Sequence, residues 1–298
     1  VQGFSAYAGV FNDSFSVITS TVGPVSGSFD SILQDANFTV TPNYTATTPG
    51  ELILDVTGLN NFWISSVDGS WESIGNWSRN EVPTLGHDVI IDNGALTVSY
   101  STPVTSPDST INTLTGGLSS NLSLTAGSEL TAAGINMLGG LSLDNATLTV
   151  NGDLIADTVT AANTSLLKGT GDLDAATSLT LVNSIVDGWF EVSSAQIIAQ
   201  GLSRFSNTGV LHEGDIQITA ASDRLLIENT VMTSISGGSS TLSMSGAGTL
   251  DLQPLSDWVI INDPVMPVAM TLDLNGGRIS NVELLTFAGV VNANLINF

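Results

Sequence analysis

Three acidic residues are the first candidates for chemistry, because they share a position in a repeated stretch of the sequence. Each of them stands directly before a leucine: Glu129, Asp153 and Asp172. Two carboxylates held a few ångströms apart are the machinery of glycoside hydrolysis. The chain has only 5 Lys and Arg residues, whereas enzymes acting on anionic sugars need positive charge. We therefore expect solvated turn acids rather than a catalytic pair.

The two histidines, His87 and His212, belong to no spaced metal motif such as HExxH, and the chain has no cysteine. The sequence also lacks a GxSxG nucleophile elbow and a GxxxxGK[ST] phosphate loop. We therefore predict no catalytic residue and no cofactor-binding residue, and we expect the protein not to be an enzyme.

Calcium is the small ligand that the acidic turns would bind best, because Asp and Asn oxygens in turns are typical calcium ligands. Such turns contain Asp68, Asp92, Asp172 and Asp273. None completes an EF-hand loop, so Ca²⁺ is considered without a defined ligand set. N-x-S/T sequons, which chance alone explains in so Ser/Thr-rich a chain, begin at Asn12, Asn37, Asn43, Asn76, Asn121, Asn145 and Asn163.

A repeat in the sequence predicts the strands and turns that position these residues. The line "NLSLTAGSELTA" from Asn121 is echoed 24 residues later by "NATLTVNGDLIA" from Asn145 and again by "NTSLLKGTGDLDA" from Asn163. Apolar residues alternate within each copy, and Gly or Asn separates the alternating segments. Period two indicates short strands joined by turns. We interpret the copies as successive turns of one coil.

Short strands repeated about every 20 residues are typical of a β-solenoid, whose turns bury their apolar faces only by stacking. No proline occurs between Pro107 and Pro254, as expected where each strand is paired on both sides. We predict an all-β fold, a right-handed parallel β-helix over 95–298 of roughly ten turns, or about 50 Å at the usual strand spacing. A pair of β-sandwiches is the rival architecture.

The residues before the coil differ, because most aromatic side chains lie before residue 101. We expect a β-rich segment over 1–60 and a Trp-rich region over 61–94 that contains Trp63, Trp71 and Trp77. Tryptophans next to the first turn would cover an open apolar end and an unpaired strand edge. The alternative is that they are exposed and stack on sugar rings. We favour the cap.

The succession W…DGSW…NW…VP…DVIID, followed by Ser/Thr/Gly-rich repeats, resembles modules of very large bacterial surface proteins of the filamentous-haemagglutinin or autotransporter-passenger style. The resemblance covers residues 28–100 best and the later repeats more loosely. It implies an exported β-helical segment of a tandem array, in which residues 1–60 close a preceding module, and it supplies no catalytic residue.

The amino-acid composition limits the classes of partner that the chain can bind. A formal net charge of −23 repels phosphate backbones and anionic membranes, so we expect no nucleic-acid binding. Apolar runs are too short for membrane insertion. The acidity either maintains solubility or suits cation-rich surroundings. Beginning at Val1, the sequence is expected to be a processed or excised segment of a longer protein.

These observations predict an extracellular structural or adhesive segment at the cell surface. We expect it to self-associate or to join neighbouring modules, because the sequence stops at "NANLINF" without a recognisable cap. Strand addition at such an end would produce a fibre. The alternative is a carbohydrate-binding or polysaccharide-processing domain on the same scaffold.

Overall fold

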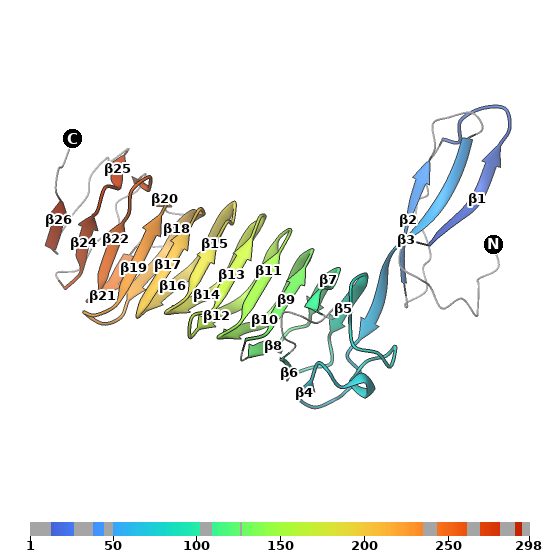
Figure 1. Cartoon of the computed structure of the whole chain (residues 1–298), viewed down its shortest axis with the longest axis horizontal. Helices are drawn as coiled ribbons and strands as arrows, with labels where there is room; N and C mark the ends of the chain where they lie inside the picture. Colours follow the sequence, from blue (N-terminus) through green and yellow to red (C-terminus); the bar gives the residue numbers. More distant parts are fainter. Residues whose placement is uncertain are drawn as a thin grey trace.

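The protein is a parallel β-solenoid of about eight turns, preceded by a small antiparallel sheet (Figure 1). The computed structural model describes residues 13–26, 38–44, 50–101, 109–125, 127–234, 243–260, 269–280 and 290–293. Almost all of the regular structure is strand. The predicted fold class is therefore confirmed, with about eight turns in place of the expected ten.

The N-terminal strands β1 (Ser14–Ser20), β2 (Phe38–Tyr44) and β3 (Gly50–Phe62) form the antiparallel sheet, with β3 between the other two. The last residues of β3 then pair in parallel with β5 (His87–Ile91). Strand β3 thus leads directly into the first turn of the coil and crosses the expected boundary at residue 60 (Figure 1).

Each turn of the coil has two arms in one long-strand sheet and a third arm in a second sheet. In the middle turns the two arms are one bent strand, and the register shifts at the bend, as between Met137 and Gly140. These bent strands are β10 (Gly134–Asp144), β12 (Leu154–Ala162), β14 (Asp172–Val182), β16 (Glu191–Gln200) and β18 (Gly209–Ile218).

Toward both ends the two arms are separate strands. Before the bent strands these are β4 (Gly69–Ser70), β5, β6 (Leu96–Tyr100), β7 (Thr113–Gly116) and β8 (Ser120–Thr125). After them come β20 (Val231–Ser234), β21 (Ser243–Gly246), β23 (Asp257–Ile260) and β25 (Arg278–Ser280).

The third arm forms a short-strand sheet of nine parallel strands in the described residues. They are β9 (Glu129–Ala132), β11 (Thr147–Val150), β13 (Leu166–Gly169), β15 (Ile185–Asp187), β17 (Leu202–Ser206), β19 (Arg224–Glu228), β22 (Thr249–Leu252), β24 (Thr271–Leu274) and β26 (Val290–Ala293).

The core consists of inward-facing apolar columns that run along the coil. Alternate residues of each strand face inward. Because neighbouring strands are in register, side chains of the same kind stack on one another from turn to turn. Fully burying one such side chain contributes about 1.5–3 kcal/mol. One column follows the short-strand sheet: Leu130, Leu148, Leu167, Val186, Phe205, Ile227, Leu252 and Leu274.

The 24-residue alignment of the first two copies does not describe stacked turns. Leu124 pairs with Leu143 in the long-strand sheet, whereas Leu148 pairs with Leu130 in the short-strand sheet. The first line runs from a long-strand arm into a short strand, and the second runs in the opposite order. The two copies look alike because every arm alternates apolar and polar residues and ends in a turn. The second and third copies do stack, since Leu148 pairs with Leu167.

Asparagine and serine make the corner between the long strands and the short strands. Asn145, Asn163 and Asn183 have positive φ values of 50°, 54° and 51°, a conformation that Asn tolerates better than most residues. Ser165 and Ser184 follow two or one residues later, are fully buried, and donate to backbone carbonyls at 2.5 and 2.9 Å. The buried hydroxyls are thus satisfied by the Ala162 and Val182 carbonyls, which also accept backbone N–H groups of the preceding turn.

The three tryptophans of the Trp-rich region are buried together at the start of the coil. Trp77 makes edge-to-face contacts with Trp63 and Trp71, at ring-centroid distances of 5.0 and 4.9 Å, and Trp71 makes one with Tyr100 at 5.3 Å. The Trp77 indole donates to the Trp71 carbonyl at 2.6 Å. Their burial supports the predicted cap and leaves no ring face open for a sugar. The region also contains the short helical turn η1 (Ile74–Asn76).

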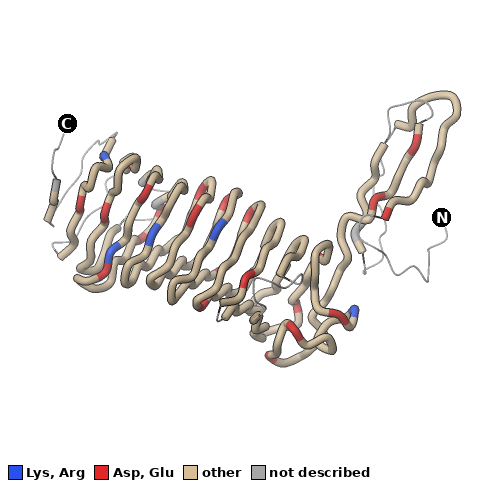
Figure 2. The backbone as a smooth tube through the Cα atoms, viewed as in Figure 1, with Lys and Arg blue, Asp and Glu red and all other residues tan. Residues whose placement is uncertain are grey.

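Acidic residues are spread along the coil, whereas the basic ones are few (Figure 2). Arg204 contacts Glu228 at 2.9 Å, and Arg278 contacts Asp257 at 2.7 Å. The Asp257 carboxylate raises the pKa of Arg278 by accepting its hydrogen bond. The scarce cations are thus used to link neighbouring turns.

Candidate functional site

The three acids proposed to share a position do not form one column. Glu129 lies in β9 and pairs with Thr147 of the short-strand sheet. Asp153 and Asp172 do stack, because the Asp172 backbone N–H donates to Asp153 Oδ1 at 3.0 Å. The predicted ladder is therefore wrong for Glu129, for the same reason that the 24-residue alignment is wrong. Asp153 acts as an acceptor for the next turn.

His87 is buried against the cap. Its Nδ1 accepts a hydrogen bond from the Thr84 backbone N–H at 2.8 Å, and its Nε2 lies 3.3 Å from Glu81 Oε1. Burial lowers the pKa of His87, and the Glu81 carboxylate partly opposes that change. Because Nδ1 accepts, the proton of the neutral ring is on Nε2 and faces Glu81. His212 lies in β18, far along the chain from His87.

Two of the acids proposed for calcium serve other roles, Asp68 as a hydrogen-bond acceptor and Asp273 as an ion-pair partner. Asp68 Oδ1 accepts from the Thr97 backbone N–H at 2.7 Å, and Asp273 Oδ2 lies 3.5 Å from the guanidinium of Arg224. Asp92 is exposed in the turn after β5. Within the described ranges, no three His, Asp or Glu side chains come together in a way that would hold a metal ion.

The sequon asparagines occupy different environments. Asn43 lies in β2, Asn76 in η1 and Asn121 in β8. Asn145 and Asn163 form corners, where the Asn163 amide donates to Asp144 Oδ1 at 2.6 Å. Asn12 and Asn37 lie outside the described residues.

An open acidic hollow of about 450 Å³ follows the bend of the long strands. Its acids are Asp174, Glu213 and Asp215. Serine hydroxyls engage them: Ser243 and Ser245 each donate to Asp215 at 2.8 Å, and Ser193 lies 3.5 Å from Asp174. The hollow brings carboxylates and hydroxyls together without a basic residue in its lining, an arrangement that offers hydrogen bonds but no compensation for an anion.

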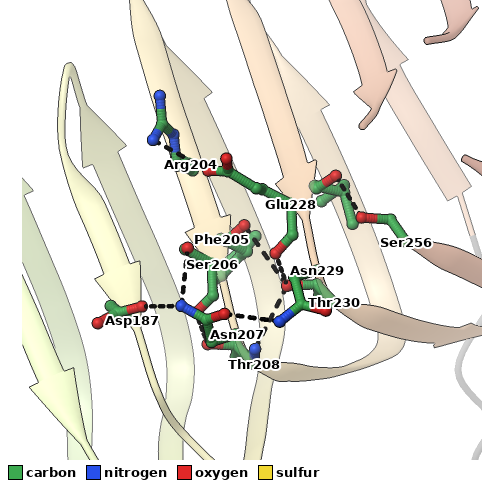
Figure 3. Close-up of polar contacts among 11 residues, drawn as sticks. Asp187, Arg204, Phe205, Ser206, Asn207, Thr208, Glu228, Asn229, Thr230 and Ser256 are labelled. Carbon is green, nitrogen blue, oxygen red and sulfur yellow. Dashed lines mark hydrogen bonds and ion pairs between the residues drawn. The ribbon is translucent and has the colours of Figure 1, made fainter. Parts of the chain in front are cut away.

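A polar ladder marks the other corner, where short strands turn back into the long-strand sheet (Figure 3). Asn207 Nδ2 donates to Asp187 Oδ1 at 2.8 Å, and Asn229 Nδ2 donates to Asn207 Oδ1 at 2.7 Å. Both asparagines are exposed and have positive φ, 52° and 45°. The ladder therefore joins three successive turns at the surface.

Beneath this ladder, hydroxyl groups are buried. Thr208 donates to the Ser206 carbonyl at 2.7 Å and Thr230 to the Glu228 carbonyl at 2.8 Å (Figure 3). Ser256 donates to the Ile227 carbonyl at 2.6 Å. The backbone that carries the exposed amides is thus held by hydrogen bonds from buried hydroxyls to its carbonyls, and these bonds fix the positions of the amides.

Beside the ladder is a second open hollow, of about 490 Å³, that sequence reasoning missed. Its lining includes Phe190, Asn207 and Asn229. Phe190 is 78% exposed, whereas the other aromatic side chains described are buried or half-buried. The signal was the adjacent pair Trp189-Phe190, because neighbours in an extended segment point to opposite sides, so that one of the two rings had to face outward.

Comparisons with known proteins add no identity: no family model, no curated protein and no solved structure matches the chain. Among the described residues, no helix is long and apolar enough to cross a membrane.

Proposed function

We propose that the chain is an extracellular structural segment: a stiff β-solenoid rod that builds length and presents a Ser/Thr/Asn surface, without catalysing a reaction. The observation that carries the proposal is the continuous core, which extends from the capping tryptophans through every described turn to Leu272. Within the described turns one uninterrupted core leaves no internal hinge, because each turn packs on both neighbours.

The surface chemistry supports the same role. Both hollows are open, and two acids of the first, Asp174 and Asp215, accept from serine hydroxyls rather than from a positioned histidine or cation. In the corner ladder, the amide of Asn207 links Asp187 to Asn229 and so joins three successive turns. Export agrees with the low content of charged residues, 11%, in a Ser/Thr/Asn-rich chain, and with the resemblance to modules of bacterial surface proteins. Joining of modules end to end would extend the rod into a fibre.

Small-angle scattering and negative-stain electron microscopy test the proposal. The solenoid should be a straight rod, about 40 Å long for about eight turns at the usual strand spacing. A compact or hinged particle would contradict it. Filaments with one chain per repeat would establish fibre assembly, whereas discrete rods at high concentration would restrict the role to a spacer. Added millimolar calcium separates a cation-dependent joint from a direct one.

A further inference from the structure

The hollow beside the polar ladder has a floor without a side chain. Gly209 pairs with Val231 of the next turn, and its N–H donates to the Trp189 carbonyl at 3.2 Å. A Cβ atom at position 209 would lie 2.3 Å from the Phe190 carbonyl oxygen. No side chain can stand there without moving the backbone, so the depression between Phe190 and Val231 is built into the turn.

One wall of the hollow is an aromatic ring held outward by its neighbours. Gly188 turns the chain with a φ of 82°, and Trp189 then points into the core, where its indole lies 3.3 Å from the Leu167 carbonyl. A Cβ at Gly169 would lie 2.4 Å from the Trp189 ring, so glycine there makes room for it. With Trp189 committed to the core, Phe190 is left outside on an ordered backbone.

The other wall offers paired donors and acceptors. Asn229 donates to Asn207, and within the described residues the amide oxygen of Asn229 accepts no hydrogen bond. Thr170, also exposed, adds a hydroxyl that donates to the Asn151 carbonyl at 3.0 Å and keeps its oxygen as an acceptor. An amide can give and receive hydrogen bonds at the same time, which is what a row of hydroxyl groups requires. A purely apolar occupant would desolvate these amides without replacing their bonds.

The charges in and near the hollow further limit the chemical class of its ligand. The lining of this hollow contains no Lys, Arg, Asp or Glu, and nearby Asp187 is already bonded to Asn207. The net charge of −23 disfavours an anionic ligand. A neutral molecule with one apolar face and many hydroxyls fits an exposed ring flanked by amides. The Asn207 amide is used by its bonds to Asp187, Ser206 and Asn229. We propose that this hollow binds a neutral saccharide chain, whose apolar ring face packs on Phe190 while its hydroxyls bond the Asn229 amide and the hydroxyl oxygen of Thr170.

The test uses the full chain and defined probes: cellohexaose, laminarihexaose, mannohexaose and chitohexaose, with polygalacturonate as the anionic comparison. Titration calorimetry should detect binding of at least one neutral hexasaccharide. Phe190→Ala should weaken that binding about tenfold or more, and Asn229→Ala about fivefold. Leu118→Ala is the matched control, because Leu118 is 75% exposed and lies in a turn near the cap. It should bind like the unmodified chain.

Thermal melting shows whether the variant remains folded. Phe190→Ala removes a largely exposed ring, so it should leave the melting temperature unchanged. The proposal is overturned if no neutral hexasaccharide binds, if Phe190→Ala binds as well as the unmodified chain, or if only polygalacturonate binds. It is also overturned if Phe190→Ala changes the sedimentation of the chain instead, because a second copy would then occupy the hollow. The rod dimensions are measured separately, so this proposal can fail while the structural role stands.

Discussion

The capping region and the middle of the coil are two solutions to the same problem of burying apolar surface in a β-protein. In the cap, Trp63, Trp71, Trp77 and Tyr100 pack edge to face around an irregular backbone. In the coil, columns mostly of leucine, valine and isoleucine repeat about every 19 residues, with single rings at Trp189, Phe205 and Trp258, and small hydroxyl and amide side chains make the corners. The cap depends on a few large contacts, and the coil on many small ones.

This difference predicts how each region fails. In a solenoid the stability is approximately a sum of turn and nearest-neighbour terms, so one weakened turn is supported from both sides. The cap has the coil on one side only, and it covers the first turn. A defect in the cap should therefore open the adjacent turns as a unit, whereas an equal defect in the coil should remain local.

Trp71→Ala should have the largest effect. Trp71 is fully buried, and removing it costs about 3–5 kcal/mol, as for other buried aromatic residues. Hydrogen exchange should show loss of protection in β5, β6 and β7 and full protection in β16. Trp71→Phe should cost less, because it keeps a ring, and because within the described residues the Trp71 indole N–H has no hydrogen-bond partner. Leu167→Ala is the coil counterpart. Equal spreading of exchange from Leu167→Ala would contradict the comparison.

The ion pair between the neighbouring turns that contain β19 and β22 should have the next largest effect. Asp251 is buried and its carboxylate bonds Arg224, Gln253 and Asn275. Arg224→Ala leaves that buried carboxylate without its cation, and urea unfolding should show a loss of about 2 kcal/mol, reduced because the arginine is 43% exposed. The double change Arg224→Ala with Asp251→Asn should recover part of it. A double change that loses the sum of both single effects would show that the pair is not coupled.

Sequence periodicity predicted the fold class, because alternation, glycine and the proline-free stretch are local properties that every turn repeats. It also predicted a cap from clustered tryptophans. The stacking register was not accessible in the same way: Glu129 and Asp153 both precede leucine, yet Glu129 begins β9 of the short-strand sheet and Asp153 precedes β12 of the long-strand sheet. Which arm of a turn a segment forms is decided by packing across the coil. The hollow at Phe190 was missed because it is created by a glycine on the following turn.

The cap should also respond to pH, whereas the coil core should not. Burial lowers the pKa of His87 below its ordinary value of about 6.5. As the pH falls below about 6.5, the unfolded chain takes up the proton before the folded chain does, so stability is lost down to the lowered pKa. The slope is at most about 1.4 kcal/mol per pH unit for one proton. Protonation also removes the Nδ1 acceptor of the Thr84 N–H.

Hydrogen exchange in β5 between pH 7 and 5.5 measures this response. The charges that face His87 are Glu81 and Asp88, which favour its protonated form, and Arg79, which opposes it. His87→Gln should remove the pH dependence within that window, and His212→Gln should leave it in place. Unchanged pH dependence in His87→Gln would assign the effect to the carboxylates.

A substitution in a single corner of the coil should have the smallest effect on the free energy of unfolding. Two substitutions at Asn207 separate the contribution of its backbone conformation from that of its amide hydrogen bonds. Asn207 contributes a backbone of φ 52° and an amide that links Asp187 to Asn229. Asn207→Gly keeps the backbone freedom and should cost about 0.5–1 kcal/mol for the lost amide bonds. Asn207→Ala adds the strain of positive φ and should cost about 1 kcal/mol more. Equal costs in urea unfolding would mean that the amide alone matters. Because similar corners recur on successive turns, even such small terms accumulate, so the coil gains stability from many small contacts in addition to the buried rings of Trp189, Phe205 and Trp258.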